Sequence, residues 1–259
     1  MLREPKVSTD RTWPCYNAIV DIRRLHPWEV SLEEARDIQR YLASQVSQLS
    51  TISERPRFVA GKDISAPDPD GVAWGAAVVM SLPDLRVVEV KQAQGKPGFP
   101  YIPGFLSFRE APLVLSALER LVTTPDFIIA DGQGLAHPRH FGLACHLGLF
   151  ADTPTIGCAK SLLRGRNGSL DRERGAWAAL EDHGDVVGAA LRTRESVSPI
   201  YVSVGHKVDL PSALRWVLTC CAGYRMPEPA RLAHQAAAGR LEECEPEQTP
   251  VGLYQAAFF

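Results

Sequence analysis

The feature that most constrains this chain is a short apolar segment, residues 126–130, that runs directly into residues 131–134, Asp-Gly-Gln-Gly. A short apolar run that ends at turn residues is typical of a buried strand. A carboxylate therefore leaves a core strand and enters a turn, where glycines let a ligand approach main-chain N–H groups. The third glycine of a dinucleotide-binding loop is missing, because position 137 is His137. We therefore predict a site for chemistry other than dinucleotide binding.

Length and composition predict one intracellular domain. The chain has 259 residues, 45% of them hydrophobic and 22% charged, which suffices for one substantial core. No apolar run is long enough to cross a membrane, and the N-terminus lacks the apolar region of a signal peptide. We expect a soluble cytoplasmic monomer without membrane contact. The six cysteines contain no Cys-x-x-Cys pair, so we expect them to be reduced.

The order of segments predicts an α/β fold. Residues 1–30 have no clear period and form an irregular lead-in, and a catalytic domain follows over 31–223, opened by a capping box at residues 31–34 and an amphipathic helix. A peripheral helix and C-terminal tail are expected over 224–259. The patterns predict strands near 57–64, 72–81, 85–93, 126–131, 154–159, 186–192 and 199–205, and helices near 108–121, 138–149 and 210–222. This order matches a ribonuclease H-like mixed central sheet flanked by helices.

Several runs in fixed order resemble one known family. They are residues 58–65 (Phe-Val-Ala-Gly-Lys-Asp-Ile-Ser), 100–110 (Pro-Tyr-Ile-Pro-Gly-Phe-Leu-Ser-Phe-Arg-Glu), 131–139, 154–161 (Pro-Thr-Ile-Gly-Cys-Ala-Lys-Ser) and 204–206. Together they closely resemble endonuclease V, a nuclease that cuts DNA near deaminated adenine, over roughly residues 31–222. The resemblance implies a metal-dependent DNA repair endonuclease. Such an enzyme recognises deoxyinosine and hydrolyses the second phosphodiester bond 3′ to it, leaving 3′-hydroxyl and 5′-phosphate ends.

Three carboxylates carry the predicted chemistry. Asp63, Glu110 and Asp131 are distant in sequence, but the first and fourth strands of a ribonuclease H-like sheet are neighbours, which would bring all three together. Such a cluster repels itself unless hard divalent cations neutralise it, and oxygen ligands favour Mg²⁺, or Mn²⁺ in its place, over zinc. Phosphodiester hydrolysis is the reaction that such a site performs. The resemblance places these residues at the family's catalytic and metal-binding carboxylates.

Each carboxylate also has a structural interpretation. Asp131 could form a turn with Gly132, and Glu110 could close a capping box that opens at Ser107. Asp63 is harder to explain structurally, because an unpaired charge in an apolar strand is costly. For Glu110 the residues alone leave capping and metal binding equally open, and the resemblance favours the metal.

Two further residues enter the predicted catalytic site through the resemblance. His206 ends an alternating strand, where a lone histidine is usually structural or exposed. The resemblance implies that it completes the acidic site, where it would position or deprotonate the attacking water or support a second metal position. Lys160 is implied to hold the scissile phosphate. Lys62, directly before the first aspartate, could pair with a carboxylate.

A wedge and a base pocket complete the predicted site. The resemblance implies that Pro100, Tyr101, Ile102 and Pro103 separate the strands at the lesion, with Tyr101 stacked where the extruded base had been. The alternative is a loop packed onto the core. Glycines around the base could instead serve close helix packing. The implied pocket residues are Gly104, Leu106, Gly132, His137, Gly142, Gly157 and Ala159.

The predicted partner is DNA that contains deoxyinosine. The alternatives are an endoribonuclease acting on inosine in RNA, although nothing in the sequence reads a 2′-hydroxyl, and a lesion-binding protein without catalysis. Because the formal charge is −2, a DNA-binding surface must be local, and the basic residues over 160–174 are a candidate unless they form a solvated loop. Residues Gln255–Phe259 resemble peptides that bind the replication sliding clamp, although packing onto the domain is the interpretation we favour.

Overall fold

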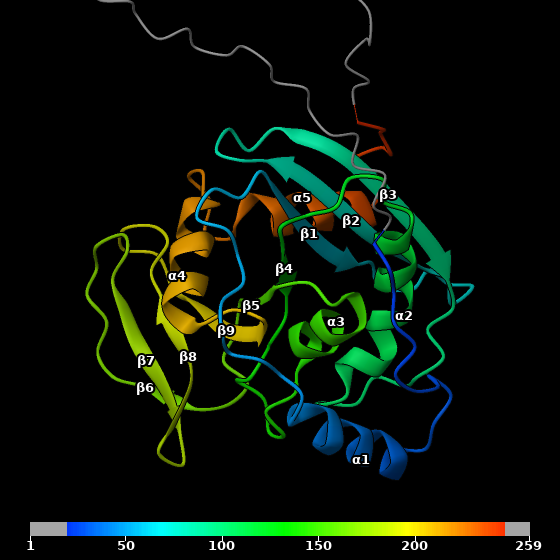
Figure 1. The fold of residues 1–259 in the computed structure, drawn as a ribbon, viewed down its shortest axis with the longest axis horizontal. Helices are drawn as coiled ribbons and strands as arrows, with labels where there is room; N and C mark the ends of the chain where they lie inside the picture. Colours follow the sequence, from blue (N-terminus) through cyan, green and yellow to red (C-terminus); the bar gives the residue numbers. More distant parts are fainter. Residues whose placement is uncertain (1–19, 247–259) are drawn as a thin grey trace, which may run out of the picture.

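A mixed nine-stranded sheet forms the centre of residues 20–246, the part of the chain that this computed structural model describes (Figure 1). The strand order is β3-β2-β1-β4-β5-β9-β8-β7-β6. The strands are β1 (Phe58–Ile64), β2 (Ala73–Ser81), β3 (Val87–Gly95), β4 (Phe127–Asp131), β5 (Thr155–Ala159), β6 (Arg166–Asn167), β7 (Trp177–Asp182), β8 (Asp185–Leu191) and β9 (Ile200–His206). The helices are α1 (Leu32–Ala43), α2 (Leu106–Glu119), α3 (Leu143–Ala151), α4 (Leu210–Thr219) and α5 (Glu228–Ala237).

Alternation along the central strands divides the core into two layers. Ala60, Ile128 and Ala130 pack with apolar residues of α2 and α3. Val59 and Phe127 point the other way and pack with α4 and α5. Burial on both faces explains why these strands are apolar throughout rather than alternating with polar residues. The predicted α/β class with a mixed sheet flanked by helices is confirmed.

Pairing of the central strands fixes where each strand ends. β1 runs parallel to β4 with Lys62 opposite Ala130, so the carboxyl ends of both strands meet at one edge of the sheet. β5 is parallel to β4, whereas β9 is antiparallel to β5. β9 therefore ends on the opposite side of the sheet, next to the amino ends of β4 and β5.

The first helix begins as its sequence predicts. The Ser31 side chain accepts a hydrogen bond from the Glu34 N–H at 3.2 Å, and the Glu34 carboxylate accepts one from the Ser31 N–H at 2.7 Å. This reciprocal pair is the predicted capping box. By contrast, α3 begins only at Leu143, later than the predicted start at residue 138.

Helix α5 belongs to the core, so the prediction of a peripheral helix after residue 223 is wrong. Ala230, Ala233 and Ala236 are fully or almost fully buried. A side chain at Gly61 of β1 would place its Cβ only 1.9 Å from the Pro229 carbonyl oxygen. The glycine and the small alanines let the helix backbone lie directly on the strand.

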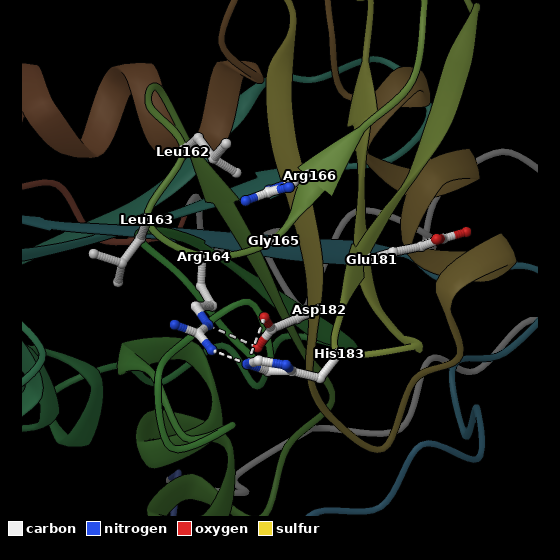
Figure 2. Close-up of a pocket in the computed structure, with 8 residues that line it drawn as sticks. All are labelled: Leu162, Leu163, Arg164, Gly165, Arg166, Glu181, Asp182 and His183. Carbon is white, nitrogen blue, oxygen red and sulfur yellow. Dashed lines mark hydrogen bonds and ion pairs between the residues drawn. The ribbon is translucent and has the colours of Figure 1, made fainter.

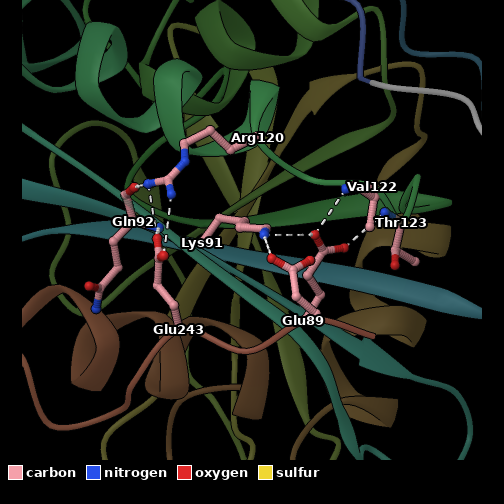
Figure 3. A network of polar contacts seen from close by, with 8 residues as sticks. Glu89, Lys91, Gln92, Arg120, Val122, Thr123 and Glu243 are labelled. Carbon is pink, nitrogen blue, oxygen red and sulfur yellow. Dashed lines mark hydrogen bonds and ion pairs between the residues drawn. The ribbon is translucent and has the colours of Figure 1, made fainter. Parts of the chain in front are cut away.

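The segment after α5 is tied to the β3 edge by polar contacts (Figure 3). The Glu243 carboxylate accepts a hydrogen bond from the Gln92 N–H at 2.6 Å and pairs with Arg120 at 2.9 Å. Lys91 pairs with Glu245, and Cys244 forms a bridge with Val90. The clamp-like residues 255–259 lie outside the described part of the chain, so clamp binding stays a prediction.

Part of the predicted irregular lead-in is packed. The Trp28 ring lies 4.8 Å from the Phe150 ring, measured between centroids, and Val20 is 3% exposed. Strand β7, whose Trp177 is 56% exposed, was not predicted. Its apolar run over residues 177–180 is short and contains two alanines, a residue type that is depleted in strands. None of the helices within residues 20–246 has the length and apolarity needed to cross a membrane.

Candidate active site

The three predicted carboxylates meet at the carboxyl ends of β1 and β4. Because Lys62 lies opposite Ala130 in the parallel pair, Asp63 and Asp131 follow as neighbours. Glu110 reaches the same edge from α2. Burial raises the pKa of Glu110, Lys62 opposes that rise, and the nearby charges of Asp63 and Asp131 add to it. Lys62 contacts both the Glu110 carboxylate and the Asp131 carbonyl oxygen, so these residues lie close together and like charges there repel one another.

The capping interpretation of Glu110 does not hold. Helix α2 begins at Leu106, and its N-cap residue Phe105 makes no side-chain capping bond. The Ser107 hydroxyl is instead bonded to His146 Nδ1 at 2.9 Å. Glu110 therefore lies inside the helix and is free of a capping role.

Each carboxylate has a basic side chain as a close partner. Lys160 Nζ lies 2.6 Å from Asp131 Oδ2, as the predicted proximity of Lys160 to the site requires. Lys62 Nζ lies 3.7 Å from Glu110 Oε2 and donates a hydrogen bond of 3.0 Å to the Asp131 carbonyl oxygen. Because the Lys62 side chain is 0% exposed, its ammonium is a fixed positive charge beneath the acidic cluster.

His206 is absent from this cluster, so the prediction that it completes the acidic site is wrong. It pairs with Thr155, at the start of β5, whereas the acidic residues lie at the other end of that strand. Its Nδ1 accepts a hydrogen bond from the Ser47 N–H at 3.2 Å, and its Nε2 lies 4.0 Å from Asp152 Oδ1. Burial lowers the pKa of His206 to about 4. These contacts describe a structural histidine.

His234 of α5 takes the position that the sequence analysis gave to His206. Its Nδ1 donates a hydrogen bond of 2.7 Å to Asp63 Oδ2, and its side chain is 58% exposed. The sequence analysis missed it because α5 was assigned to the periphery. The spacing of the small residues on α5, described above, is the signal that could have placed this helix on the sheet. A cavity of about 90 Å³ lies beside His234. It is lined by Asp131, Lys160, Met226, Ala230, Arg231 and His234.

The acidic residues have the composition of a hard-cation site. Within residues 20–246 no three His, Cys, Asp or Glu side chains already converge as metal ligands, because the carboxylates are turned toward Lys62, Lys160 and His234. Three carboxylates offer only oxygen ligands, which suit Mg²⁺ or Mn²⁺. The mutual repulsion that helps to raise the pKa of Glu110 is what a bound cation would relieve. The residues therefore fit such a cation once the side chains of Lys160 and His234 turn away.

The predicted wedge is divided between an anchor and an exposed tip. Ile102 packs on a cluster that contains Phe99, Phe105 and Phe108. Tyr101 beside it is 72% exposed. The loop-packing interpretation therefore accounts for Ile102 and leaves Tyr101 unexplained. Pro100 and Pro103 on either side are also exposed.

Four of the predicted pocket residues come together around one cavity of about 40 Å³. They are Gly104, Leu106, His137 and Gly142, and the cavity is completed by Ser107, Gln133, Leu143 and Leu163. The sequence did not predict these last four as pocket residues. The side chain of His137 donates from Nε2 to the Gly104 carbonyl oxygen at 3.0 Å, and burial together with Arg139 lowers its pKa to about 4.

The other three predicted pocket residues lie outside this lining. A Cβ at Gly157 would stand 2.5 Å from the Gly134 nitrogen, so Gly157 serves close packing beneath the loop, as its structural interpretation holds. Gly132 is bridged to Cys158. Ala159 ends β5 and is 6% exposed. Gly142 lines the cavity and also allows close packing, since a Cβ there would stand 2.3 Å from the Gln133 carbonyl oxygen.

A separate cavity of about 610 Å³ lies beside the basic stretch and is lined by none of the predicted site residues (Figure 2). Arg164 points toward Asp182 and His183 there. Its Nε donates to Asp182 Oδ2 at 2.7 Å, and its Nη2 lies 2.8 Å from His183 Nε2. The charge of Arg164 is thus largely compensated inside the protein. The prediction of a positive surface over residues 160–174 rests on the remaining basic residues.

Comparisons with known proteins agree with this geometry. A family model described as Endonuclease V matches residues 40–235. An endonuclease V from Trichormus variabilis is 48% identical over 221 residues, which are 85% of this chain and 100% of that protein. The crystal structure of an endonuclease V from Streptomyces avermitilis has a TM-score of 0.76 at 41% identity, covering 82% of this chain and 93% of that one.

A further similar structure contains a nucleic acid. It is an endonuclease V from Ciona intestinalis in complex with a 24mer DNA containing an inosine followed by a ribo-adenosine. Its TM-score is 0.70 at 26% identity, and the match covers 80% of this chain and 96% of that one. The residues matched by the family model, 40–235, include Asp63, Glu110, Asp131 and His234.

Proposed function

This chain belongs to the endonuclease V family of nucleases, and from this premise we propose that it is a metal-dependent DNA repair endonuclease that recognises deoxyinosine. It hydrolyses the second phosphodiester bond 3′ to the lesion and leaves 3′-hydroxyl and 5′-phosphate ends. The observation that carries the proposal is the meeting of Asp63, Glu110 and Asp131 at one sheet edge. Both Glu110 and the base cavity are built on the start of α2.

The acidic residues would hold the cation that the reaction needs. Asp63, Glu110 and Asp131 would bind Mg²⁺, with Mn²⁺ able to substitute. When bound, such a cation activates water and stabilises charge on the phosphate oxygens. Lys62 supports this arrangement from below, since its contacts to Glu110 and to the Asp131 carbonyl oxygen fix both residues.

His234 and Lys160 act on the proton and on the phosphate. Because His234 Nδ1 donates to Asp63, the neutral ring presents Nε2 as a proton acceptor, which suits a general base for water. Lys160, 51% exposed, exchanges its contact with Asp131 for the scissile phosphate and stabilises the charge that develops there.

Recognition uses the wedge and the small cavity. Tyr101 enters the DNA duplex and stacks where the extruded base had been, which recovers part of the unstacking cost of about a few kcal/mol. The base enters the cavity lined by Gly104, Leu106, His137 and Gly142. Gly157 lies directly against the backbone of Gln133, which lines the cavity, and we place Gly132 and Ala159 around the base on the resemblance alone. We also propose that it acts as a monomer on DNA in the cytoplasm.

Inosine in RNA is the second candidate substrate. The DNA in the Ciona complex has a ribo-adenosine directly after the inosine, so a 2′-hydroxyl next to the lesion is accommodated in that protein. This observation keeps an endoribonuclease activity open for this chain, and a substrate comparison separates the two.

The test is a cleavage assay with matched substrates. The purified protein and Mg²⁺ are incubated with a DNA duplex holding one deoxyinosine, the same duplex with deoxyadenosine, and an RNA holding one inosine. We expect the lesion strand of the DNA to be cut and the undamaged duplex to remain intact. Cutting of the RNA alone would reassign the substrate. Lesion binding without cutting, even in Mn²⁺, would identify a binding protein instead.

A further inference from the structure

A series of hydrogen bonds runs from the partly exposed lead-in segment to the buried lining of the base cavity. His26 Nδ1 lies 2.8 Å from the Pro27 carbonyl oxygen, and its Nε2 lies 2.6 Å from His146 Nε2. His146 Nδ1 in turn lies 2.9 Å from the Ser107 hydroxyl oxygen. His146 is 0% exposed and Ser107 is 3% exposed. Ser107 lines the cavity of about 40 Å³ at the start of α2.

The direction of every hydrogen bond in this series is fixed from one end. A carbonyl oxygen only accepts, so His26 must carry its proton on Nδ1 and leave Nε2 as an acceptor. His146 must then donate from Nε2, which leaves its Nδ1 as an acceptor. Ser107 must therefore donate its hydroxyl proton to His146. This assignment holds when both rings are neutral, and burial favours the neutral rings because it lowers the pKa of His26 and of His146.

A serine whose proton is committed in this way offers only lone pairs to other partners. A second acceptor stands at the same cavity: the Gln133 side chain donates from Nε2 to the Ser161 carbonyl oxygen at 2.9 Å. This bond identifies the other end of the amide as oxygen. That oxygen, Oε1, is buried and has no hydrogen-bond partner among the described residues. An unpaired buried acceptor is costly unless a ligand donates to it.

We propose that Ser107 Oγ, with Gln133 Oε1 beside it, accepts a hydrogen bond from the ring N–H of the deaminated base. This inference rests on the proposed function and assigns its specificity. Deamination of adenine to hypoxanthine converts N1 from an acceptor into an N–H donor. The paired acceptors therefore attract hypoxanthine and repel adenine, whose N1 lone pair would face them. His26 and His146 are positioning residues that hold Ser107 in its acceptor state.

The cavity must widen for a base to enter. A volume of about 40 Å³ is close to the roughly 30 Å³ share of one water molecule, which is too small for a purine. Leu163 closes one side and is 44% exposed, so its displacement into solvent opens the pocket while Ser107 and Gln133 stay in place.

The test compares binding of two bases by matched variants. Affinities are measured in Ca²⁺ for duplexes holding deoxyinosine or deoxynebularine, whose purine ring has no N1–H. We expect Ser107→Ala to weaken deoxyinosine binding by about tenfold, the size expected for one lost hydrogen bond, and to leave deoxynebularine binding unchanged or tighter, because the N1 lone pair of that base then faces one acceptor fewer. Ser116→Ala is the control, because Ser116 lies on the same helix and donates to the Pro112 carbonyl oxygen at the surface.

A second measurement needs no variant of Ser107. Long-range ¹H–¹⁵N spectra of the histidine rings should show the proton on Nδ1 of His26 and on Nε2 of His146. In His26→Ala the fixed end of the series is gone, so Ser107 can donate or accept. The preference for deoxyinosine over deoxynebularine should then shrink about severalfold.

Two results would overturn this inference alone: equal losses for both bases in Ser107→Ala, or a proton on Nδ1 of His146. A wild-type protein that binds deoxyinosine no better than deoxyadenosine would overturn the proposed function instead. A retained wild-type preference that Ser107→Ala leaves untouched would remove the role of Ser107 and keep the proposed function.

Discussion

The hydrogen bond of 2.7 Å from His234 Nδ1 to Asp63 Oδ2 joins the last described helix to the first strand of the sheet. It places an imidazole in the acidic cluster from a segment that the sequence analysis had set apart. The contact is possible because α5 lies directly on β1, where Gly61 leaves room for the helix backbone. The account of catalysis therefore assigns proton transfer to His234 and only a structural role to His206.

The two histidines make opposite predictions for cleavage. His234→Ala should lower the single-turnover cleavage rate by about 100-fold or more, the range in which general acid–base catalysis contributes. His206→Asn should keep the rate within about threefold, since an asparagine oxygen can still accept from the Ser47 N–H. Melting temperatures of both variants serve as the folding control. A larger loss in His206→Asn than in His234→Ala would refute the assignment.

The paired aspartates should separate cutting from binding. Asp63→Asn and Asp131→Asn keep the shape of each side chain and remove the charge that a divalent cation requires. We expect cleavage in Mg²⁺ to fall by at least about 1000-fold while deoxyinosine binding in Ca²⁺ stays within about fivefold. Gel-shift titration and product analysis measure the two quantities. Normal turnover in Asp131→Asn would exclude it as a metal ligand.

Tyr101 should show the reverse behaviour. Tyr101→Ala removes the exposed wedge tip and leaves the acidic cluster intact, so lesion affinity should weaken by about tenfold or more with little change in turnover at saturating DNA. Tyr41→Ala is the matched control, because Tyr41 on α1 is 70% exposed and Tyr101 is 72% exposed. A turnover defect at saturation, with unchanged affinity, would rule out the wedge.

Local patterns predicted much of the fold, because they depend on the immediate neighbours of each residue. The capping box at Ser31, the central strands and the ends of β1 and β4 all follow from apolar runs and turn residues. The resemblance to endonuclease V is confirmed by the family match over residues 40–235. Proximity of Asp63 and Asp131 followed once the two strands were assumed to be neighbours.

Long-range pairing was the part that the sequence could not supply. His206 ends a correctly predicted strand. Because β9 is antiparallel to β5, however, His206 lies beside the start of β5, away from the acidic cluster. The sequence starting at Ser107 has the form of a capping box, but its hydroxyl is committed to His146, a partner distant in sequence. Strand direction and buried polar partners are tertiary properties, so a local pattern leaves them open.

Buried neutral histidines should make stability depend on pH. The pKa values of His137 and His206 are each about 4 in the folded protein, below the value of about 6.5 for an unfolded chain. The unfolded state therefore binds more protons between these values, so their contribution to stability is complete above about pH 6.5 and is lost as the pH falls toward 4.

This dependence can be measured by urea unfolding between pH 4 and pH 8. In His206→Asn the number of protons taken up on unfolding should fall by about one, which makes the loss of stability with acid shallower. An unchanged pH slope in this variant would contradict the burial of a neutral His206.

The position of the cut tests the central claim most directly. A duplex labelled at the 5′ end of the strand that holds one deoxyinosine is incubated with the protein in Mg²⁺, and the product is sized beside a ladder of the same sequence. The account predicts one product that ends in a 3′-hydroxyl at the second phosphodiester 3′ to the lesion, with no product from EDTA-treated protein or from the deoxyadenosine duplex. Equal cutting of the undamaged duplex, or no cutting of the lesion strand in Mg²⁺ or Mn²⁺, would contradict it.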